Sequence, residues 1–105
     1  MHLAFQFREL RELCLNEAAA VERYGADMAA HLRSLLADMI AADTLAELVT
    51  GNLRADPRDS DLFLMDLGAF GRVSFRPNHI RKNDDVMKPE RVSRVMVISV
   101  EINNA

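Results

Sequence analysis

Apolar and polar residues alternate with a period of two at both ends of the chain. Near the start, Leu3, Phe5 and Phe7 are each separated by one intervening residue. Alternation of this kind is typical of a half-buried β-strand. The segment 92–102 alternates in the same way and predicts the last strand. Its expected faces are Met96, Ile98, Val100 and Ile102 on one side, and Val95, Val97, Ser99 and Glu101 on the other.

From residue 8 onward the apolar residues recur at helical spacing. The first helix is weakened or interrupted at Asn16 and ends at Tyr24-Gly25, because glycine is favoured at a helix C-cap. The second helix begins at Ala26 or Asp27, and Asp43-Thr44 ends it or starts a short turn through Leu48. A regular stripe predicts that this helix faces the core. The stripe consists of Met28, Leu32, Leu35, Leu36, Met39 and Ile40.

Short apolar runs separated by turn signals dominate the second half of the chain. Residues 62–67 predict a strand that is apolar on both faces, and 68–71 a tight antiparallel hairpin. Residues 72–77 predict a strand with one core face and one cationic face, and 78–91 a polar loop. The order predicts a single α+β domain over residues 1–105. Two N-terminal helices would pack on one face of a mostly antiparallel sheet of four or five strands.

Composition excludes several classes of protein. No run of about 18 apolar residues exists, and the N-terminus lacks an apolar signal segment, so we expect a cytoplasmic protein without a membrane span. Cys14 is the only cysteine, which excludes an internal disulfide and a multi-thiolate metal site. Its position in an apolar stripe predicts a small core residue. A catalytic thiolate would need a basic partner in space.

Charge is distributed unevenly, although the net charge is only −3. Residues 1–53 carry four arginines against eight acidic residues, whereas residues 71–94 carry seven basic residues against three acidic ones. The local field decides whether an anionic ligand is attracted, so the second half is the candidate binding region. The alternative is an ordinary solvated surface.

Arginines on one strand face are the strongest candidate chemistry. Arg72 and Arg76 project to the same side, about 13 Å apart, and Arg94 opens the neighbouring strand. A guanidinium offers paired donors that match phosphate oxygens. His79 is the candidate for proton transfer, because the ordinary pKa of an imidazole is about 6.5. The alternatives are a salt bridge from Arg72 to Asp66 or a neighbour, and an ordinary loop histidine.

Other chemistry is not indicated. The chain has no Gly-rich phosphate loop and no nucleophile elbow, and its histidines are too scattered to argue for a metal by spacing. We therefore expect no metal and no cofactor. His31 lies off the apolar stripe and is expected on the surface.

A series of short motifs follows in a fixed order along nearly the whole chain. They are Tyr24-Gly25, the Leu/Met helix, Thr44-Leu45-Ala46-Glu47-Leu48, Asp66-Leu67, the strand Arg72-Val73-Ser74-Phe75-Arg76-Pro77 and the last strand to Glu101. This order resembles the plasmid-maintenance killer proteins, the HigB-like branch of the RelE toxin superfamily. The resemblance implies a RelE-like fold and the toxin component of a type II toxin–antitoxin system.

The implied activity is metal-independent, ribosome-dependent cleavage of mRNA by attack of a 2′-hydroxyl on the adjacent phosphate. Arg72 matches the family's strand arginine, which is implied to contact the scissile phosphate, and Phe75 and Pro77 match its Phe-x-Pro frame. The implied partners are mRNA on the ribosome and a helix-turn-helix antitoxin, with which the chain would form an oligomer.

The chain departs from the family pattern at two places. The family's Gly-Asp-Arg turn is replaced by Asp56-Pro57-Arg58-Asp59, where Arg58 is an approximate substitute. Glu101 matches, but Ile102, Asn103 and Asn104 stand in place of the terminal Asp-Tyr-His, which is thought to help proton transfer. Asparagine cannot act as a general acid or base near neutral pH.

These matches and departures define the candidate site and leave two functions open. We expect Arg72, His79 and Glu101 to be catalytic, and the RNA-binding residues to be Arg58, Arg76, Arg81, Lys82 and Arg94. The alternative is a catalytically inactive RelE-fold binding or regulatory protein that acts through a protein partner.

Overall fold

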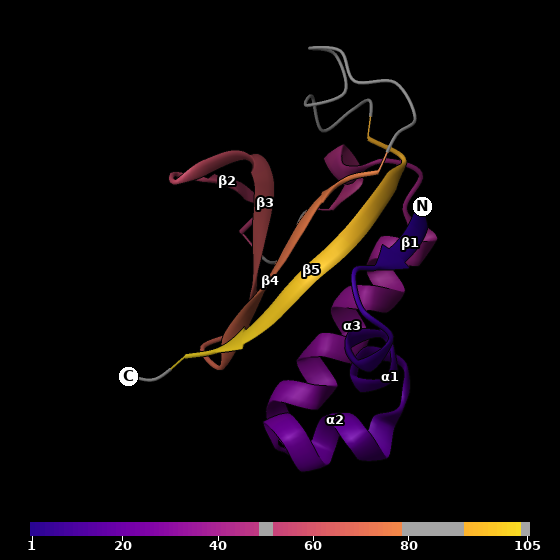
Figure 1. The fold of residues 1–105 in the computed structure, drawn as a ribbon, viewed down its shortest axis with the longest axis vertical. Helices are drawn as coiled ribbons and strands as arrows, with labels where there is room; N and C mark the ends of the chain where they lie inside the picture. The colour runs from indigo at the N-terminus through magenta and orange to yellow at the C-terminus, as the bar shows by residue number, and fades with distance from the viewer. Residues whose placement is uncertain (49–51, 79–91, 104–105) are drawn as a thin grey trace.

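A computed structural model describes residues 1–48, 52–78 and 92–103 of the chain. Over these residues the protein is α+β, with three α-helices and a five-stranded mixed sheet (Figure 1). The elements in chain order are β1 (His2–Phe5), α1 (Arg8–Leu15), α2 (Glu17–Tyr24), α3 (Ala26–Ala41), the 3₁₀ turn η1 (Leu45–Glu47), β2 (Arg54–Asp56), β3 (Asp59–Leu67), β4 (Gly71–Pro77) and β5 (Arg94–Ile102). The predicted α+β class is confirmed.

The strands lie in the order β1-β5-β4-β3-β2. Strand β1 pairs in parallel with β5, and the other neighbouring strands are antiparallel. Both chain ends therefore contribute neighbouring strands, and the N-terminus lies beside the beginning of β5 (Figure 1). The tight hairpin predicted at 68–71 joins β3 to β4, with the Phe70 amide donating to the Leu67 carbonyl at 3.1 Å.

The first predicted helix is two helices, because Asn16 caps both. Its backbone N–H donates to the Glu12 carbonyl at the end of α1, and its side chain accepts from the Ala19 amide at the start of α2. The predicted interruption at Asn16 is thus confirmed, and the count of helices becomes three. Phe7, predicted as a strand residue, is instead the exposed residue that precedes α1.

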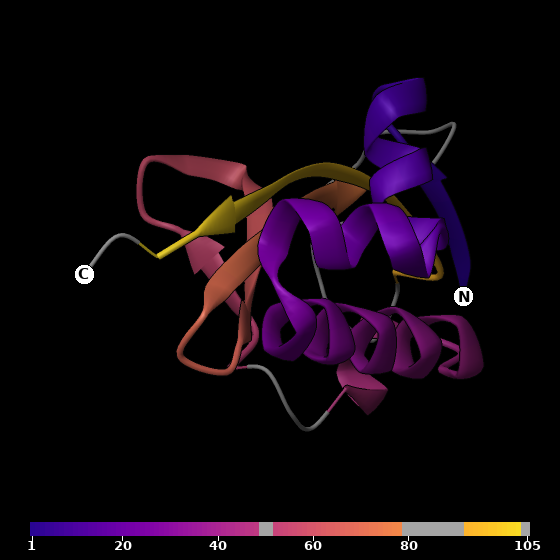
Figure 2. The same cartoon turned by 90° about the horizontal axis from the view of Figure 1, so that it is seen from below.

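The core lies between the helices and one face of the sheet. Figure 2 shows α2 and α3 side by side against the strands. The predicted stripe of α3 is buried except for Ile40, which is exposed. From the sheet, the core receives Phe63, Met65, Leu67, Val73, Phe75, Val95 and Val97. The rings of Phe63 and Phe75 stack with their centroids 6.1 Å apart.

A β-bulge in β5 corrects the predicted faces of the last strand. Ser74 pairs with Ser99 but Phe75 pairs with Val97, so β5 contains one extra residue, Ile98. An extra residue reverses the alternation beyond it. Val97 and Val100 therefore both lie on the core side, while Met96, Ser99 and Glu101 lie on the opposite face.

Strand β2 was not predicted. It has only three residues, Arg54–Asp56, and pairs with β3 through an irregular register. Its sequence shows no apolar alternation, so no local pattern marks it. Among the described residues, no helix combines the length and apolar character needed to cross a membrane.

Candidate functional site

The face of the sheet opposite the helices is covered by no described helix (Figure 1). We call this surface the open face. Alternation along β4 places Arg72, Ser74 and Arg76 on it, as the sequence predicts, because Val73 and Phe75 between them are in the core. Cross-strand pairing adds Asp66 from β3 and Glu101 from β5, each opposite Arg72.

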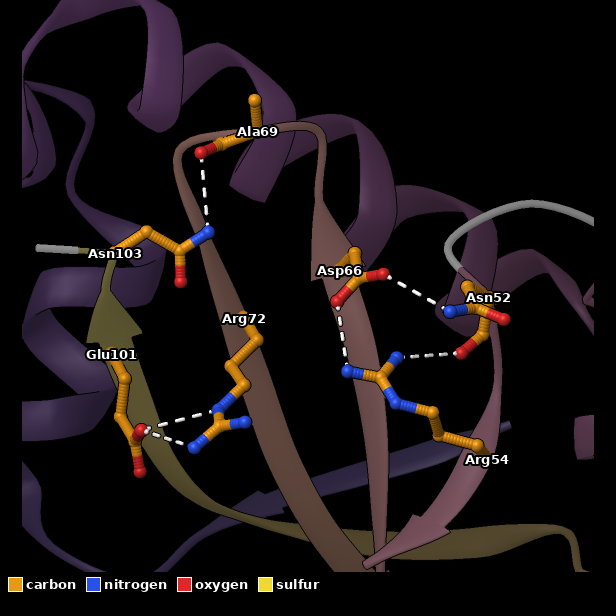
Figure 3. A network of polar contacts seen from close by, with 7 residues as sticks. All are labelled: Asn52, Arg54, Asp66, Ala69, Arg72, Glu101 and Asn103. Atoms are coloured by element: carbon orange, nitrogen blue, oxygen red, sulfur yellow. Dashed lines mark hydrogen bonds and ion pairs between the residues drawn. The ribbon is translucent and has the colours of Figure 1, made fainter. Parts of the chain in front are cut away.

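A row of alternating charges crosses the open face near the β3–β4 turn (Figure 3). In strand order it reads Arg54, Asp66, Arg72, Glu101. Arg54 Nη2 contacts Asp66 Oδ1 at 3.1 Å, and Arg72 Nη2 contacts Glu101 Oε2 at 3.0 Å. The row consists of two ion pairs, so its formal charge is zero. A phosphate would have to compete with the carboxylates for these guanidiniums.

The Arg72–Glu101 pair leaves donors and acceptors free. Both Nε and Nη2 of Arg72 donate to the same carboxylate oxygen, Oε2 of Glu101, at 3.2 and 3.0 Å. Within the described residues, Nη1 of Arg72 and Oε1 of Glu101 make no hydrogen bond. The side chains are 33% and 52% exposed. The pair can therefore contact a ligand that reaches the open face from solvent.

Next along the strands, the open face is neutral. The hydroxyls of Ser74 and Ser99 lie 2.5 Å apart and bond to each other. Leu64, opposite Ser74, is buried although it does not belong to the core cluster. This middle zone separates the charged row from the far end of β4.

The far end of the open face carries two exposed cations. Arg76 pairs across the ladder with Met96, and Arg94 lies two residues before Met96 on the same face. Such diagonal neighbours have Cα atoms about 7–8 Å apart. Neither arginine forms an ion pair with another residue in the described ranges 1–48, 52–78 and 92–103. Arg76 lies four strand residues from Arg72, roughly 13 Å, and Arg94 lies about six ladder positions away, roughly 20 Å. The predicted arginines therefore do not converge on one point.

Arg58 lies apart from these groups in the turn between β2 and β3. Asp56 shapes that turn by accepting the Arg58 amide at 2.8 Å. The Arg58 side chain is 79% exposed and its Nε is 3.7 Å from Asp56 Oδ1. Arg58, the approximate match to the family's turn arginine, is therefore an exposed cation with only a long contact to Asp56.

Three of the predicted site residues fall outside the part of the chain that the structure describes. His79, Arg81 and Lys82 lie outside the described residues, as does Asn104. Asn103 is described: its amide nitrogen Nδ2 donates to the Ala69 carbonyl at 3.1 Å (Figure 3). Its backbone N–H donates to the Phe70 carbonyl at 2.9 Å. This residue joins the end of β5 to the β3–β4 turn.

The other titratable groups of interest within the described residues are Cys14 and His31. Cys14 packs against the core as predicted, and burial raises the pKa of its thiol to about 11. A raised pKa disfavours the thiolate that a nucleophile needs. His31 is exposed as predicted, and its ring lies 5.4 Å from that of Phe70. In the part of the chain that the structure describes, no three His, Cys, Asp or Glu side chains are grouped to hold a metal.

Two pockets flank the open face and differ in charge. One of about 360 Å³ lies between α3 and the end of β3, and its lining includes His31, Asp38 and Asp66. Two carboxylates make it unsuited to an anion. The other, of about 280 Å³, lies where β1 meets β5 and contains Arg94.

Sequence reasoning missed Arg54, the two serines and His2 as residues of this face. Arg54 was missed because β2 was missed. Ser99 follows the bulge, so simple alternation was not enough to pair it with Ser74. His2 was missed because the parallel pairing of β1 with β5, which makes His2 the ladder partner of Arg94, joins residues far apart in the chain.

Comparison of the chain with family models, with curated proteins and with solved structures finds no match. The chain is thus an α+β protein with a charged sheet face that no helix of the described residues covers.

Proposed function

We propose that the chain is a RelE-like toxin of a type II toxin–antitoxin system, a metal-independent endoribonuclease that cleaves mRNA on the ribosome. A helix-turn-helix antitoxin would bind and neutralise it in the cytoplasm. The order of elements supports this proposal: a strand, the helices, and then strands joined by tight turns, as the resemblance implies.

The observation that carries the proposal is the contact between Arg72 and Glu101 on the open face. Cleavage by a 2′-hydroxyl needs positive charge on the pentacoordinate phosphorane and a group that takes the hydroxyl proton. The Arg72 guanidinium supplies the charge, and the Glu101 carboxylate supplies the proton acceptor. The two residues are ladder partners on neighbouring strands, so the backbone pairing keeps their side chains within reach of one another.

The proposed reaction begins when a phosphate of the RNA displaces Glu101 from Arg72. Arg72 then donates to the phosphate oxygens, and the freed carboxylate accepts the proton of the attacking 2′-hydroxyl. The 2′-oxygen bonds to phosphorus, the bond to the 5′-oxygen breaks, and a 2′,3′-cyclic phosphate forms. The leaving 5′-oxygen takes a proton from His79 or from water.

Inducible expression in a bacterial host without the antitoxin tests this proposal. We expect growth arrest and shortened mRNA with the wild-type chain, and neither with Arg72→Ala. Arg33→Ala is the matched control, because Arg33 is an exposed arginine whose ion pair with Glu17 lies on the helices. Normal growth with intact mRNA would count against a nuclease.

A second candidate is a catalytically inactive RelE-fold protein that acts through a protein partner. The neutral row of ion pairs favours it, because both guanidiniums already have carboxylate partners. Asn103 favours it as well. It stands at a position where the family resemblance implies a proton-transfer residue, but its side chain is hydrogen-bonded to the β3–β4 turn. Absence of ribosome-dependent cleavage together with a stoichiometric complex with a helix-turn-helix protein would favour this function.

A further inference from the structure

A pocket of about 280 Å³ lies at the edge of the sheet, away from the Arg72–Glu101 pair. The described residues that line it are His2, Leu3, Ala4, Asn78 and Arg94. Three strands build it: β1 supplies the first three residues, β5 supplies Arg94, and Asn78 follows directly after β4.

Backbone hydrogen bonds fix the positions of these residues. The amide of His2 donates to the Ser93 carbonyl at 3.0 Å, and the amide of Asn78 donates to the Arg94 carbonyl at 2.8 Å. His2 is also the ladder partner of Arg94 in the parallel pair. These contacts hold the backbone of three strand segments together, and His2, Asn78 and Arg94 from these segments line the same pocket.

The electrostatics of this pocket favour an anion. None of the described residues that line it is acidic, and Arg94 forms no ion pair with a residue of the described ranges. Arg76 lies diagonally across the ladder and adds a second positive charge nearby. Arg94 offers paired donors, while His2 and Asn78 add neutral or cationic donors.

We infer that this pocket binds the phosphate group of a nucleotide in single-stranded RNA. Its volume lies below the range of roughly 300–1,000 Å³ that is typical for drug-sized ligands. A phosphate with part of its sugar is therefore a closer match than a larger ligand. Guanidinium, imidazole and carboxamide together match a tetrahedral anion with several acceptor oxygens.

The inference rests on the proposed function for the identity of the ligand, and assigns it a second contact point. Arg72 and Arg94 stand at opposite ends of the open face. A strand of RNA that spans this face would place one phosphate at the Arg72–Glu101 pair and another phosphate of the same strand in the pocket. The second contact holds the strand without taking part in cleavage.

Titration of the ¹⁵N-labelled full chain with three probes tests the inference at low salt, where exposed charges are least screened. The probes are inorganic phosphate, 5′-AMP and a single-stranded RNA hexamer. We expect amide shifts at His2, Ala4, Asn78 and Arg94, with tighter binding of 5′-AMP and the hexamer than of inorganic phosphate. Arg94→Gln should weaken 5′-AMP binding about tenfold or more. The affinity of Arg94→Lys for 5′-AMP should lie between those of the wild type and Arg94→Gln. The affinity of Arg33→Gln should equal that of the wild type.

Absence of shifts at these amides, or unchanged affinity in Arg94→Gln, would overturn the inference. Binding of inorganic phosphate as tight as that of 5′-AMP would overturn the assignment to a nucleotide. The spectra also report whether each variant is folded. Shifts in a chain that does not cleave RNA would leave this inference standing while the proposed nuclease fails. Cleavage of RNA without these amide shifts would support the proposed nuclease and overturn this inference.

Discussion

Arg72 and Glu101 face each other across β4 and β5, and one carboxylate oxygen receives two donors of the guanidinium. The pair joins the two groups that the proposed cleavage needs, and it also neutralises them. Its exposure allows an incoming phosphate to compete for Arg72. Binding and cleavage therefore depend on Glu101 in opposite ways.

Glu101→Gln separates these two effects. Glutamine keeps the shape of the side chain but removes the negative charge, so Arg72 becomes available to phosphate. We expect RNA to bind more tightly and to gain up to one phosphate contact, which steepens the plot of log K against log[salt] by about 0.7. Cleavage should slow by about 10²–10⁴-fold, because glutamine cannot accept the proton. Fluorescence anisotropy and a gel assay of the same RNA measure the two quantities.

Either of two outcomes for Glu101→Gln would contradict this assignment. If Glu101→Gln cleaves at the wild-type rate, Glu101 is not the proton acceptor. If it binds RNA no better than the wild type, the ion pair does not restrain Arg72.

The same pair should contribute little to folding. Both side chains are partly exposed, and such pairs couple by about 0.2–1 kcal/mol. A double-mutant cycle with Arg72→Ala and Glu101→Ala, followed by urea unfolding, gives the coupling free energy. We expect it to fall further in 1 M NaCl, where the Debye length is about 3 Å. A coupling above about 2 kcal/mol would mean that the pair is structural and hard to displace.

Local patterns predicted much of the fold. The apolar stripe of α3 and the hairpin at 68–71 could both be predicted from the sequence, because helical periodicity and turn residues are local signals. Asn16 marked the break between α1 and α2 for the same reason. What was missed depends on residues far apart in the chain: the short strand β2, and the parallel pairing of β1 with β5.

The candidate site was predicted in part. Alternation along β4 correctly assigned Arg72 and Arg76 to one face. The partner of Arg72 remained open, because a carboxylate stands opposite it on each neighbouring strand: Asp66 and Glu101. Arg54 engages Asp66, and this contact depends on β2, which no sequence pattern marked. The bulge at Ile98 sets the register that brings Glu101 to Arg72.

Asn16 should contribute measurably to stability as the cap of α2. Its side-chain oxygen accepts the Ala19 amide at 3.1 Å, and α2 has only eight residues. We expect Asn16→Ala to lower the free energy of unfolding by about 0.5–2 kcal/mol. Asn16→Asp is the control, since aspartate caps about as well as asparagine. Urea denaturation measures both, and equal losses in the two variants would contradict a capping role.

Gly71 permits the close approach of β4 and β5 beside Glu101. A Cβ at this position would clash with the Glu101 carbonyl oxygen and would lie 2.6 Å from Met28 Cε. We expect Gly71→Ala to destabilise the fold by about 1–3 kcal/mol, because the backbone of β5 must move. Gly25→Ala is the comparison: it meets no atom within 4 Å, but its φ of +88° is unfavourable for alanine.

The two glycines should differ in their effect on the site. Displacement of β5 in Gly71→Ala should also shift the amides of Arg72 and Glu101 in ¹⁵N spectra, whereas Gly25→Ala should leave them unchanged. Unshifted amides in Gly71→Ala would mean that the strands absorb the added methyl elsewhere.

Cys14 should make the protein sensitive to alkaline pH. Burial raises the pKa of its thiol from 9.0 to about 11 in the folded chain. A group whose folded pKa is raised contributes stability that is complete below the unfolded pKa and is lost as pH rises towards the folded value. Stability should therefore fall between about pH 9 and pH 11. Tyr24 acts in the same direction, because burial raises its pKa and the nearby Cys14 raises it further, while Arg23 opposes this.

Two measurements check the role of the thiol. At pH 8 roughly one folded thiol in a thousand is ionised, so iodoacetamide should react far more slowly with the native chain than with the chain in urea. Cys14→Ser should flatten the fall in urea midpoint between pH 9 and pH 10.5 but not abolish it, since Tyr24 still titrates. Equal alkylation rates in native and unfolded chains, or an unchanged pH profile in Cys14→Ser, would contradict a buried, protonated thiol.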